Sequence, residues 1–389
     1  MPSSACPLRI KYFVWSWCCL ASCLWAEDGA AIPQFEFVKS QSHIVNYAFS
    51  PKGDYVASAS PHGKVSIQET NEARLTKITD PTPLLDDLNS DRFDQRERAY
   101  LQLASLGRQV QPLLRERLES PPSFEVRRRI EKLLDWIDES TGSPHQRLVT
   151  QLRFATDGRI LASGSLDKTV RLWNPQTHQI QARFGPLEEE VTALDIASGW
   201  IAVGDAGNNI YLYDRLDRSS ERLILTGHKA TIRGLCLTKD ESILFSAAGF
   251  DARIGVWKLP PDGTQPSDQV RWLTEHKDAV MCLAYSPQKN RLASGGYENQ
   301  ILIWDVNSLQ VIRRLNEPQS TVRCVCFSPD GSLLAACGDD KVIRLWNTRS
   351  WTSTELDRQM ENVQHICFSP GGDIFLSVNN AGECWTWAR

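Results

Sequence analysis

The feature that most constrains the fold of this chain is a repeat of about 40 residues that recurs along most of its length. Most repeats end in a short strand that closes on an aromatic residue, usually Trp. The strands that close on Trp lie at 170–174, 254–258, 301–305, 342–347 and 384–387. Residues 210–214 have Tyr in the same place, and residues 65–69 are the weakest copy. We therefore count seven repeats.

Two further strands precede the aromatic strand in the better repeats. Residues 161–163 and 291–294 are examples of the middle strand, and residues 322–327 are an example of the first. Hairpin turns separate them and place Gly or a polar residue where a positive φ is needed, at 50–54, 155–158 and 328–331. Short strands at this period predict an all-β propeller of seven blades.

The last repeat supplies only three strands, which we expect at 363–368, 374–378 and 384–387. A blade needs a fourth strand, since an unpaired outer edge is a liability. Residues 34–39 alternate like a strand and precede the first repeat. We expect them to pair with the final blade and close the ring.

These repeats resemble those of the WD40 family. In that family a His, a strand Ser or Thr, a turn Asp and the terminal Trp form a hydrogen-bonded chain within a blade. The resemblance implies a complete chain in the second repeat, made by His145, Ser163, Asp167 and Trp173.

The resemblance implies partial chains in three other repeats. The fourth has His228, Asp251 and Trp257, with Ala247 at the Ser position. The fifth has His276, Ser294 and Trp304, with Glu298 in place of Asp. The sixth keeps Asp340 and Trp346, with Pro318 and Ala336 at the other two positions. The first, third and seventh repeats are expected to keep little of the chain.

No catalytic, cofactor or metal site is expected. The Asp–His pairs recur from blade to blade, whereas a general base is needed only once, so we interpret them as structural. The sequence contains no phosphate-binding loop, no serine-hydrolase elbow and no HExxH zinc motif. Seven of the eleven cysteines fall in predicted strands without CxxC spacing, which favours small buried thiols over zinc ligands.

The first 26 residues resemble a signal peptide. Arg9 and Lys11 precede an apolar stretch at 12–20, which is too short to span a bilayer. Leu20 to Cys23 resembles the lipobox of bacterial lipoproteins, and this resemblance implies lipidation of Cys23. Cleavage after Ala26 and an uncleaved anchor are the alternatives. We expect an exported, periplasmic or cell-envelope protein.

Residues 80–142 interrupt the repeats with helical periodicity, between residues 33–79 (closing strand and first repeat) and residues 143–389 (repeats two to seven). Helices are expected near 92–106, near 111–118 and from Ser123 to about Asp138. The third has an apolar stripe made by Phe124, Ile130, Leu133, Leu134 and Ile137. The insertion resembles a HEAT-like fragment of the kind found in some bacterial WD40 proteins. A single such unit is expected to pack on the propeller or on a partner.

The sequence favours a non-catalytic protein-interaction scaffold, monomeric and membrane-associated through Cys23, with the insertion as the candidate surface for an unidentified protein partner. The net charge of −4 gives no overall attraction to nucleic acid. The alternative is a ligand-binding or sensory propeller that uses its central channel. An enzyme resembling propeller hydrolases or quinone-dependent dehydrogenases would need clustered channel-facing carboxylates or histidines, which the sequence does not indicate.

Overall fold

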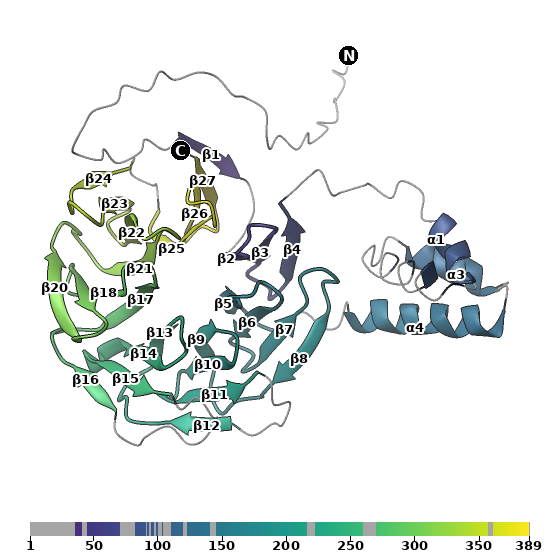
Figure 1. The fold of residues 1–389 in the computed structure, drawn as a ribbon, viewed down its shortest axis with the longest axis horizontal. Helices are drawn as coiled ribbons and strands as arrows, with labels where there is room; N and C mark the ends of the chain where they lie inside the picture. The colour runs from purple at the N-terminus through teal and green to yellow at the C-terminus, as the bar shows by residue number, and fades with distance from the viewer. Residues whose placement is uncertain are drawn as a thin grey trace, which may run out of the picture. The chain divides into compact units, whose positions relative to one another are not determined.

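The computed structural model shows the seven-bladed propeller that the sequence predicts (Figure 1). The structure describes residues 36–40, 45–70, 82–90, single positions between 92 and 103, and 110–119, 123–140, 145–215, 222–259, 270–356 and 361–388. The signal-peptide and lipidation predictions for residues 1–26 lie outside these residues. No helix among the described residues is long and apolar enough to cross a membrane.

Each blade is an antiparallel sheet whose strands follow one another from the centre of the ring outward. The first blade has the strands β2 (Asn46–Phe49), β3 (Tyr55–Ala59) and β4 (Val65–Glu69). The second blade has β5 (Val149–Phe154), β6 (Leu161–Ser165), β7 (Val170–Trp173) and β8 (Ile180–Phe184). The third has β9 (Val191–Ile196), β10 (Trp200–Asp205), β11 (Ile210–Asp214) and β12 (Arg222–Leu225).

The next three blades have the same four-stranded plan. The fourth has β13 (Ile232–Leu237), β14 (Ile243–Ala248), β15 (Ile254–Lys258) and β16 (Arg271–Leu273), with the 3-10 turn η3 (Gly249–Asp251) after β14. The fifth has β17 (Val280–Ser286), β18 (Arg291–Gly296), β19 (Ile301–Asp305) and β20 (Gln310–Leu315). The sixth has β21 (Val322–Phe327), β22 (Leu333–Gly338), β23 (Arg344–Asn347) and β24 (Ser353–Glu355).

The seventh blade is made from both ends of the repeat region. It has β25 (Val363–Phe368), β26 (Ile374–Asn379) and β27 (Cys384–Ala388), and its outer strand is β1 (Glu36–Ser40). The strands β1 and β27 pair antiparallel, with Val38 opposite Thr386. The innermost strands contact one another in the order β2, β5, β9, β13, β17, β21 and β25, and β25 contacts β2. The ring is therefore closed.

The hydrophobic core lies between neighbouring blades. The middle strands β6, β10 and β22 bury every residue because another blade covers each face. Glycines in the middle strands, including β18, allow the close approach. A Cβ atom on Gly295 would lie 2.7 Å from Val322 Cγ1 of the next blade, and one on Gly164 would lie 2.6 Å from Val191 Cγ1. Gly at these positions sets the spacing between blades.

Three described helices lie between β4 and β5 in the chain: α1 (Thr82–Asp87), α3 (Gln111–Glu119) and α4 (Phe124–Ser140). They share a core of their own, made by Leu85, Leu88, Ala99, Leu103, Val110, Leu114, Val126, Ile130 and Leu134. The Oγ atom of Ser123 accepts a hydrogen bond from the Val126 amide at 3.2 Å and caps α4. Most of the helix expected near 92–106 lies outside the described residues.

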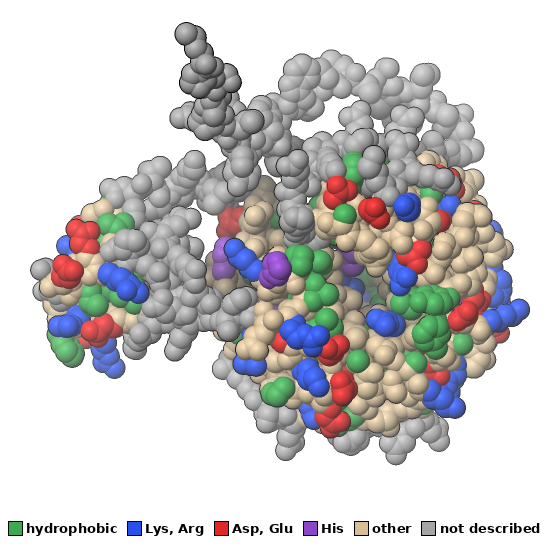
Figure 2. Space-filling view, turned by 180° about the vertical axis from the view of Figure 1, so that it is seen from behind, with side chains coloured by type: hydrophobic (Ala, Val, Ile, Leu, Met, Phe, Trp, Pro, Cys, Tyr) green, Lys and Arg blue, Asp and Glu red, His purple; other side chains and the backbone are tan. Residues whose placement is uncertain are grey.

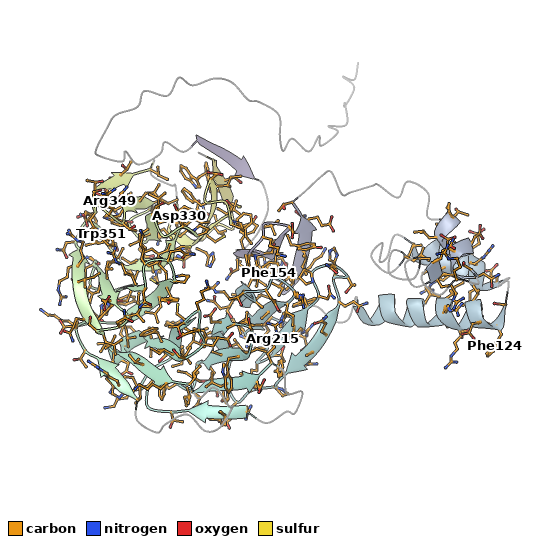
Figure 3. The ribbon with its side chains drawn as sticks, viewed as in Figure 1. Phe124, Phe154, Arg215, Asp330, Arg349 and Trp351 are labelled. Carbon is orange, nitrogen blue, oxygen red and sulfur yellow. The ribbon has the colours of Figure 1, made fainter. Side chains whose placement is uncertain are left out.

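The predicted apolar stripe of α4 is wrong at its start. Phe124 is 80% exposed and projects from the first turn, whereas Val126, Ile130 and Leu134 are buried at intervals of four residues (Figure 3). Phe124 directly follows the capping residue, and its position around the helix axis faces away from this buried row. The side chains of Leu133 and Ile137 lie outside the described residues.

Candidate functional site

The polar residues predicted for the second blade meet in one buried chain. His145 Nδ1 lies 2.9 Å from Asp167 Oδ2, and His145 Nε2 lies 2.7 Å from Ser163 Oγ. The indole N–H of Trp173 donates to the same Ser163 Oγ at 2.8 Å. Burial lowers the pKa of His145, against the opposing effect of Asp167. A neutral imidazole that donates from Nδ1 and accepts at Nε2 satisfies every partner.

The fourth blade has a complete chain, and the expectation of Ala247 at its Ser position is wrong. His228 Nε2 lies 2.7 Å from Ser246 Oγ, and Trp257 donates to the same oxygen at 2.7 Å. His228 Nδ1 lies 2.6 Å from Asp251 Oδ2. Ser246 pairs with Leu235 as Ser163 pairs with Leu152, after the same bulge in the first strand. The turn that contains η3 is one residue longer, so Trp257 lies 11 positions after Ser246, whereas Trp173 lies 10 after Ser163.

The fifth blade keeps only part of the chain. His276 Nε2 lies 2.7 Å from Ser294 Oγ, and Trp304 donates to that oxygen at 2.8 Å. Glu298 approaches His276 Nδ1 only to 3.7 Å, beyond hydrogen-bonding distance, and its Oε1 accepts the Asp278 amide instead. Burial lowers the pKa of His276 to about 4.

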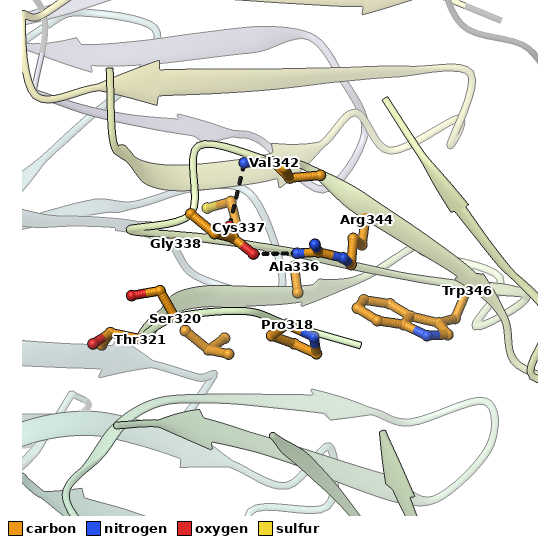
Figure 4. A pocket seen from close by; sticks show the side chains of 11 residues that line it. Pro318, Ser320, Thr321, Ala336, Cys337, Gly338, Val342, Arg344 and Trp346 are labelled. Carbon is orange, nitrogen blue, oxygen red and sulfur yellow. Dashed lines mark hydrogen bonds and ion pairs between the residues drawn. The ribbon is translucent and has the colours of Figure 1, made fainter. Parts of the chain in front are cut away.

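The sixth blade has a gap where the chain would run. Pro318 and Ala336 occupy the His and Ser positions and line a cavity of about 10 Å³ beside Asp340 and Trp346 (Figure 4). The buried indole N–H of Trp346 has no partner in the described part of the chain. Asp340 instead pairs with Arg344.

Two blades that were expected to keep little of the chain have short substitutes. In the seventh blade, Trp387 donates to Ser377 Oγ at 2.9 Å. In the third, the Tyr211 hydroxyl donates to Asp205 Oδ2 at 2.9 Å. All of these polar groups make their hydrogen bonds within single blades. His145, His228 and His276 are buried, so none of them is placed to meet a substrate.

The cysteines of the innermost strands are free thiols, on β13 (Cys236), β17 (Cys282), β21 (Cys324 and Cys326) and β25 (Cys367). The Sγ atoms of Cys282 and Cys324 lie 3.8 Å and 3.7 Å from carbonyl oxygens of the next blade, those of Val322 and Ile366. Burial raises the pKa of Cys326 to about 11 and also raises those of Cys236 and Cys367. Within the described residues no group of His, Cys, Asp and Glu could hold a metal ion.

A second cavity, of about 470 Å³, lies at the turns of the first three blades. Its wall is polar and includes Lys52, Asp54, Asp157, Arg159, Asn174 and Arg215. Arg215, labelled in Figure 3, pairs with Asp157 at 2.7 Å and donates to the Ala197 carbonyl at 3.0 Å. The pair of Arg215 and Asp157 links the third blade to the second.

The feature that the sequence analysis missed is an aromatic pair on loops of the fourth and fifth blades. Phe250 in η3 is 75% exposed, and its ring meets the ring of Tyr297 edge-on, with centroids 5.5 Å apart. The guanidinium of Arg323 lies over the Tyr297 ring, 5.9 Å from its centroid. It also donates two hydrogen bonds to Asp339, at 2.9 Å and 2.7 Å. We call Arg233, Phe250, Tyr297, Arg323 and Asp339 the rim surface.

The rim surface brings together loops that are distant in sequence. The Gly249 amide donates to Thr231 of the strand entry in the same blade, and the Tyr297 amide donates to Ala279. The turn η3 also contacts β17 of the fifth blade. Figure 2 shows one face of the molecule, where basic and acidic side chains are interspersed with hydrophobic ones. Exposed large apolar side chains that lie together can mark an interaction site.

Comparison with known proteins agrees with the geometry. The family model described as "WD domain, G-beta repeat" matches residues 139–174, 219–258, 267–305 and 309–347. These segments end at the Trp strands β7, β15, β19 and β23.

Similar curated proteins share the repeat over part of their length. A WD repeat-containing protein VIP3 of Arabidopsis thaliana is 28% identical over 175 residues, 41% of this chain and 53% of the relative. A ribosome biogenesis protein WDR12 homolog of Anopheles gambiae is 26% identical over 119 residues, 30% of this chain and 27% of the relative. Striatin-4 of Mus musculus is 28% identical over 179 residues, 44% of this chain and 20% of the relative. The matches span about half of the first relative and less of the others.

Proposed function

We propose that the protein is a non-catalytic scaffold that binds other proteins, since four segments of this seven-bladed propeller match the WD domain, G-beta repeat model. The observation that carries the proposal is the rim surface, where Phe250 is 75% exposed beside Tyr297 and Arg323. Aromatic residues and Arg are enriched at protein interfaces and supply most of their hot spots. The burial of His145, His228 and His276 supports a structural role for the closed ring.

The helical residues 80–142 supply a second candidate surface. We propose that they form a HEAT-like unit that adds partner specificity. Their shared core and the exposed Phe124 support this proposal, since a folded unit with an exposed aromatic side chain suits recognition.

Affinity capture with the intact protein, beside a version that lacks residues 80–142, tests the scaffold proposal. Captured proteins are identified by mass spectrometry. We expect the intact protein to retain defined partners. Partners lost only from the shortened form would identify the helices as the recognition element, and partners kept by both would identify the propeller. Failure of both forms to capture any protein would contradict the scaffold, and small-molecule screening of the channel would follow.

The location of the protein is a separate proposal. We propose that the chain is exported as a monomer and held in the cell envelope by a lipid on Cys23, as the lipobox-like residues 20–23 suggest. Detergent phase partition of the full chain beside Cys23→Ala checks this. The unaltered protein should enter the detergent phase and the variant the aqueous phase. Equal partition of the two would rule out lipidation at Cys23.

A further inference from the structure

The rim surface has an exposed apolar centre, Phe250, whose position is fixed by the loop that carries it. Ala252 follows η3 with a φ of +54°, which turns the chain sharply and leaves Phe250 at the tip of the loop. The Phe250 ring makes its edge-on contact with Tyr297 at an interplanar angle of 89°. Its other side is open, since 75% of the residue is exposed. An apolar side chain from a partner could cover this ring.

The charges next to this centre divide into paired and unpaired groups. Arg253 pairs with Asp251 at 2.8 Å, and Arg323 pairs with Asp339 at 2.7 Å. Asn362 donates a further hydrogen bond to Asp339 at 3.2 Å. These pairs are fixed parts of the surface and need no partner molecule.

The remaining cations belong to chain segments next to those that carry Phe250 and Tyr297. Arg233 Cγ would lie 4.0 Å from a Cβ atom on Gly249, the residue before Phe250. The Lys229 amide donates to Asp251, the residue after Phe250, at 3.3 Å. Lys277 precedes Asp278, whose amide donates to Glu298 next to Tyr297. Within the described residues, the charged groups of Lys229, Arg233 and Lys277 have no side-chain partner.

Two of the acidic groups nearby are paired with cations and two are not. Asp251 accepts from His228 and Arg253, and Asp339 accepts from Arg323. Glu298 and Asp278 accept hydrogen bonds from backbone amides at 2.7 Å and 2.6 Å, and not from Lys or Arg. The three unpaired cations outnumber these two carboxylates, and the carboxylates of a ligand would satisfy the cations that remain.

We propose that the rim surface binds an acidic segment of a partner protein that carries a large apolar side chain. The apolar side chain packs on Phe250 and Tyr297, and neighbouring carboxylates meet Arg233, Lys229 and Lys277. This inference rests on the proposed scaffold function and names the chemistry of its partner.

A protein segment fits this surface better than a nucleic acid does. Three unpaired cations on a chain with a net charge of −4 provide little of the counterion release that drives phosphate-backbone binding. The edge-on arrangement of Phe250 and Tyr297 also lacks the parallel platform on which successive bases stack.

The test uses short random peptides displayed on phage and selected on the immobilised full chain. Enriched peptides are synthesised, and their affinities are measured for the unaltered protein, Phe250→Ala and Arg233→Glu. Ile312→Ala on β20 is the matched control, since Ile312 is 46% exposed and lies outside the rim surface. None of these side chains is buried, so all variants are expected to fold.

We expect the enriched peptides to combine Asp or Glu with Phe, Trp, Leu, Ile or Met. Phe250→Ala and Arg233→Glu should each weaken binding by at least about tenfold, and Ile312→Ala by less than about twofold. Peptides that bind all variants equally would overturn the proposed site and leave the scaffold function standing. Competition by a single-stranded oligonucleotide, or enrichment of peptides without acidic residues, would overturn the proposed partner chemistry. If no peptide is enriched, the inference is wrong, and the affinity capture alone then judges the scaffold.

Discussion

At the scale of single residues, the blades differ in the hydrogen-bond partners of the buried Trp indole that closes the third strand. Trp173, Trp257 and Trp304 each donate to a Ser hydroxyl that also meets a His. Trp387 has the Ser but no His, and Trp346 has neither. A buried donor without a partner costs about 1–3 kcal/mol, so these differences should be measurable as stability.

Replacing Ser246 tests the chain of the fourth blade. Ser246→Ala leaves both Trp257 Nε1 and His228 Nε2 without their partner and should lower the free energy of unfolding by about 1–3 kcal/mol. Urea unfolding measures this. Ser377→Ala is the matched control, since it removes one contact, from Trp387, and should cost less. An equal cost for the two variants would show that the His contact adds nothing.

The opposite change should repair the sixth blade. Ala336→Ser places a hydroxyl where the other blades have one, beside the small cavity and the unpartnered Trp346 N–H. We expect the free energy of unfolding to rise by about 1 kcal/mol, measured in urea. A loss of stability would mean that the cavity is too tight for the added oxygen.

The buried histidines predict how stability changes with pH. His276 is held neutral in the folded protein, where burial lowers its pKa to about 4, while in the unfolded chain it titrates near its usual value of 6.5. Between these values the unfolded chain binds more protons, so stability is complete above pH 6.5 and falls as the pH drops toward 4.

The size of this effect can be isolated by mutation. From pH 7 to pH 5 the contribution of His276 to the free energy of unfolding should fall by about 2 kcal/mol. Denaturant unfolding across this range should therefore show a shallower pH dependence in His276→Gln than in the unaltered protein. Identical slopes would contradict a buried neutral imidazole.

At the scale of elements, the contact between neighbouring blades depends on glycine at certain positions of the middle strands. Gly295→Ala places a Cβ atom 2.7 Å from Val322 Cγ1 and 3.3 Å from Cys282 Sγ. Overpacking of this kind costs about 1–3 kcal/mol. Gly295→Ala should therefore unfold at a lower temperature than the unaltered protein. The double variant Gly295→Ala/Val322→Ala should lose less in unfolding temperature than the sum of the decreases caused by Gly295→Ala and Val322→Ala alone. Strict additivity would mean that the blades shift apart freely.

Strand order and blade number could be predicted from the sequence because alternation, turn Gly and terminal Trp recur at one period. The position of Ser246 could not, because the turn that contains η3 holds one extra residue: Trp257 lies 11 positions after Ser246, whereas Trp173 lies 10 after Ser163, so the usual spacing leads to Ala247. The exposure of Phe250 was also missed, since an aromatic residue in a turn has the same pattern whether its ring packs or protrudes. Phe124 was placed on the buried stripe for a related reason: spacing alone does not fix the rotation of a first helical turn.

At the scale of the whole molecule, the closed ring and the surfaces on its loops have different roles. The strand β1 completes the last blade and ties residues 36–40 to residues 384–388. The His, Ser and Trp contacts stabilise single blades, and the rim surface draws on loops of the fourth, fifth and sixth. Loss of a blade contact should therefore reduce stability, whereas changes at the rim surface should reduce binding and leave stability unchanged.

The most direct measurement is affinity capture from cells that make the protein, with the unaltered chain beside the double variant Phe250→Ala/Arg233→Glu and with Ile312→Ala as control. Quantitative mass spectrometry compares the captured proteins. The account predicts that partners of the unaltered chain fall by at least about tenfold with the double variant and persist with the control. The same partners at the same yield from all three proteins would contradict it.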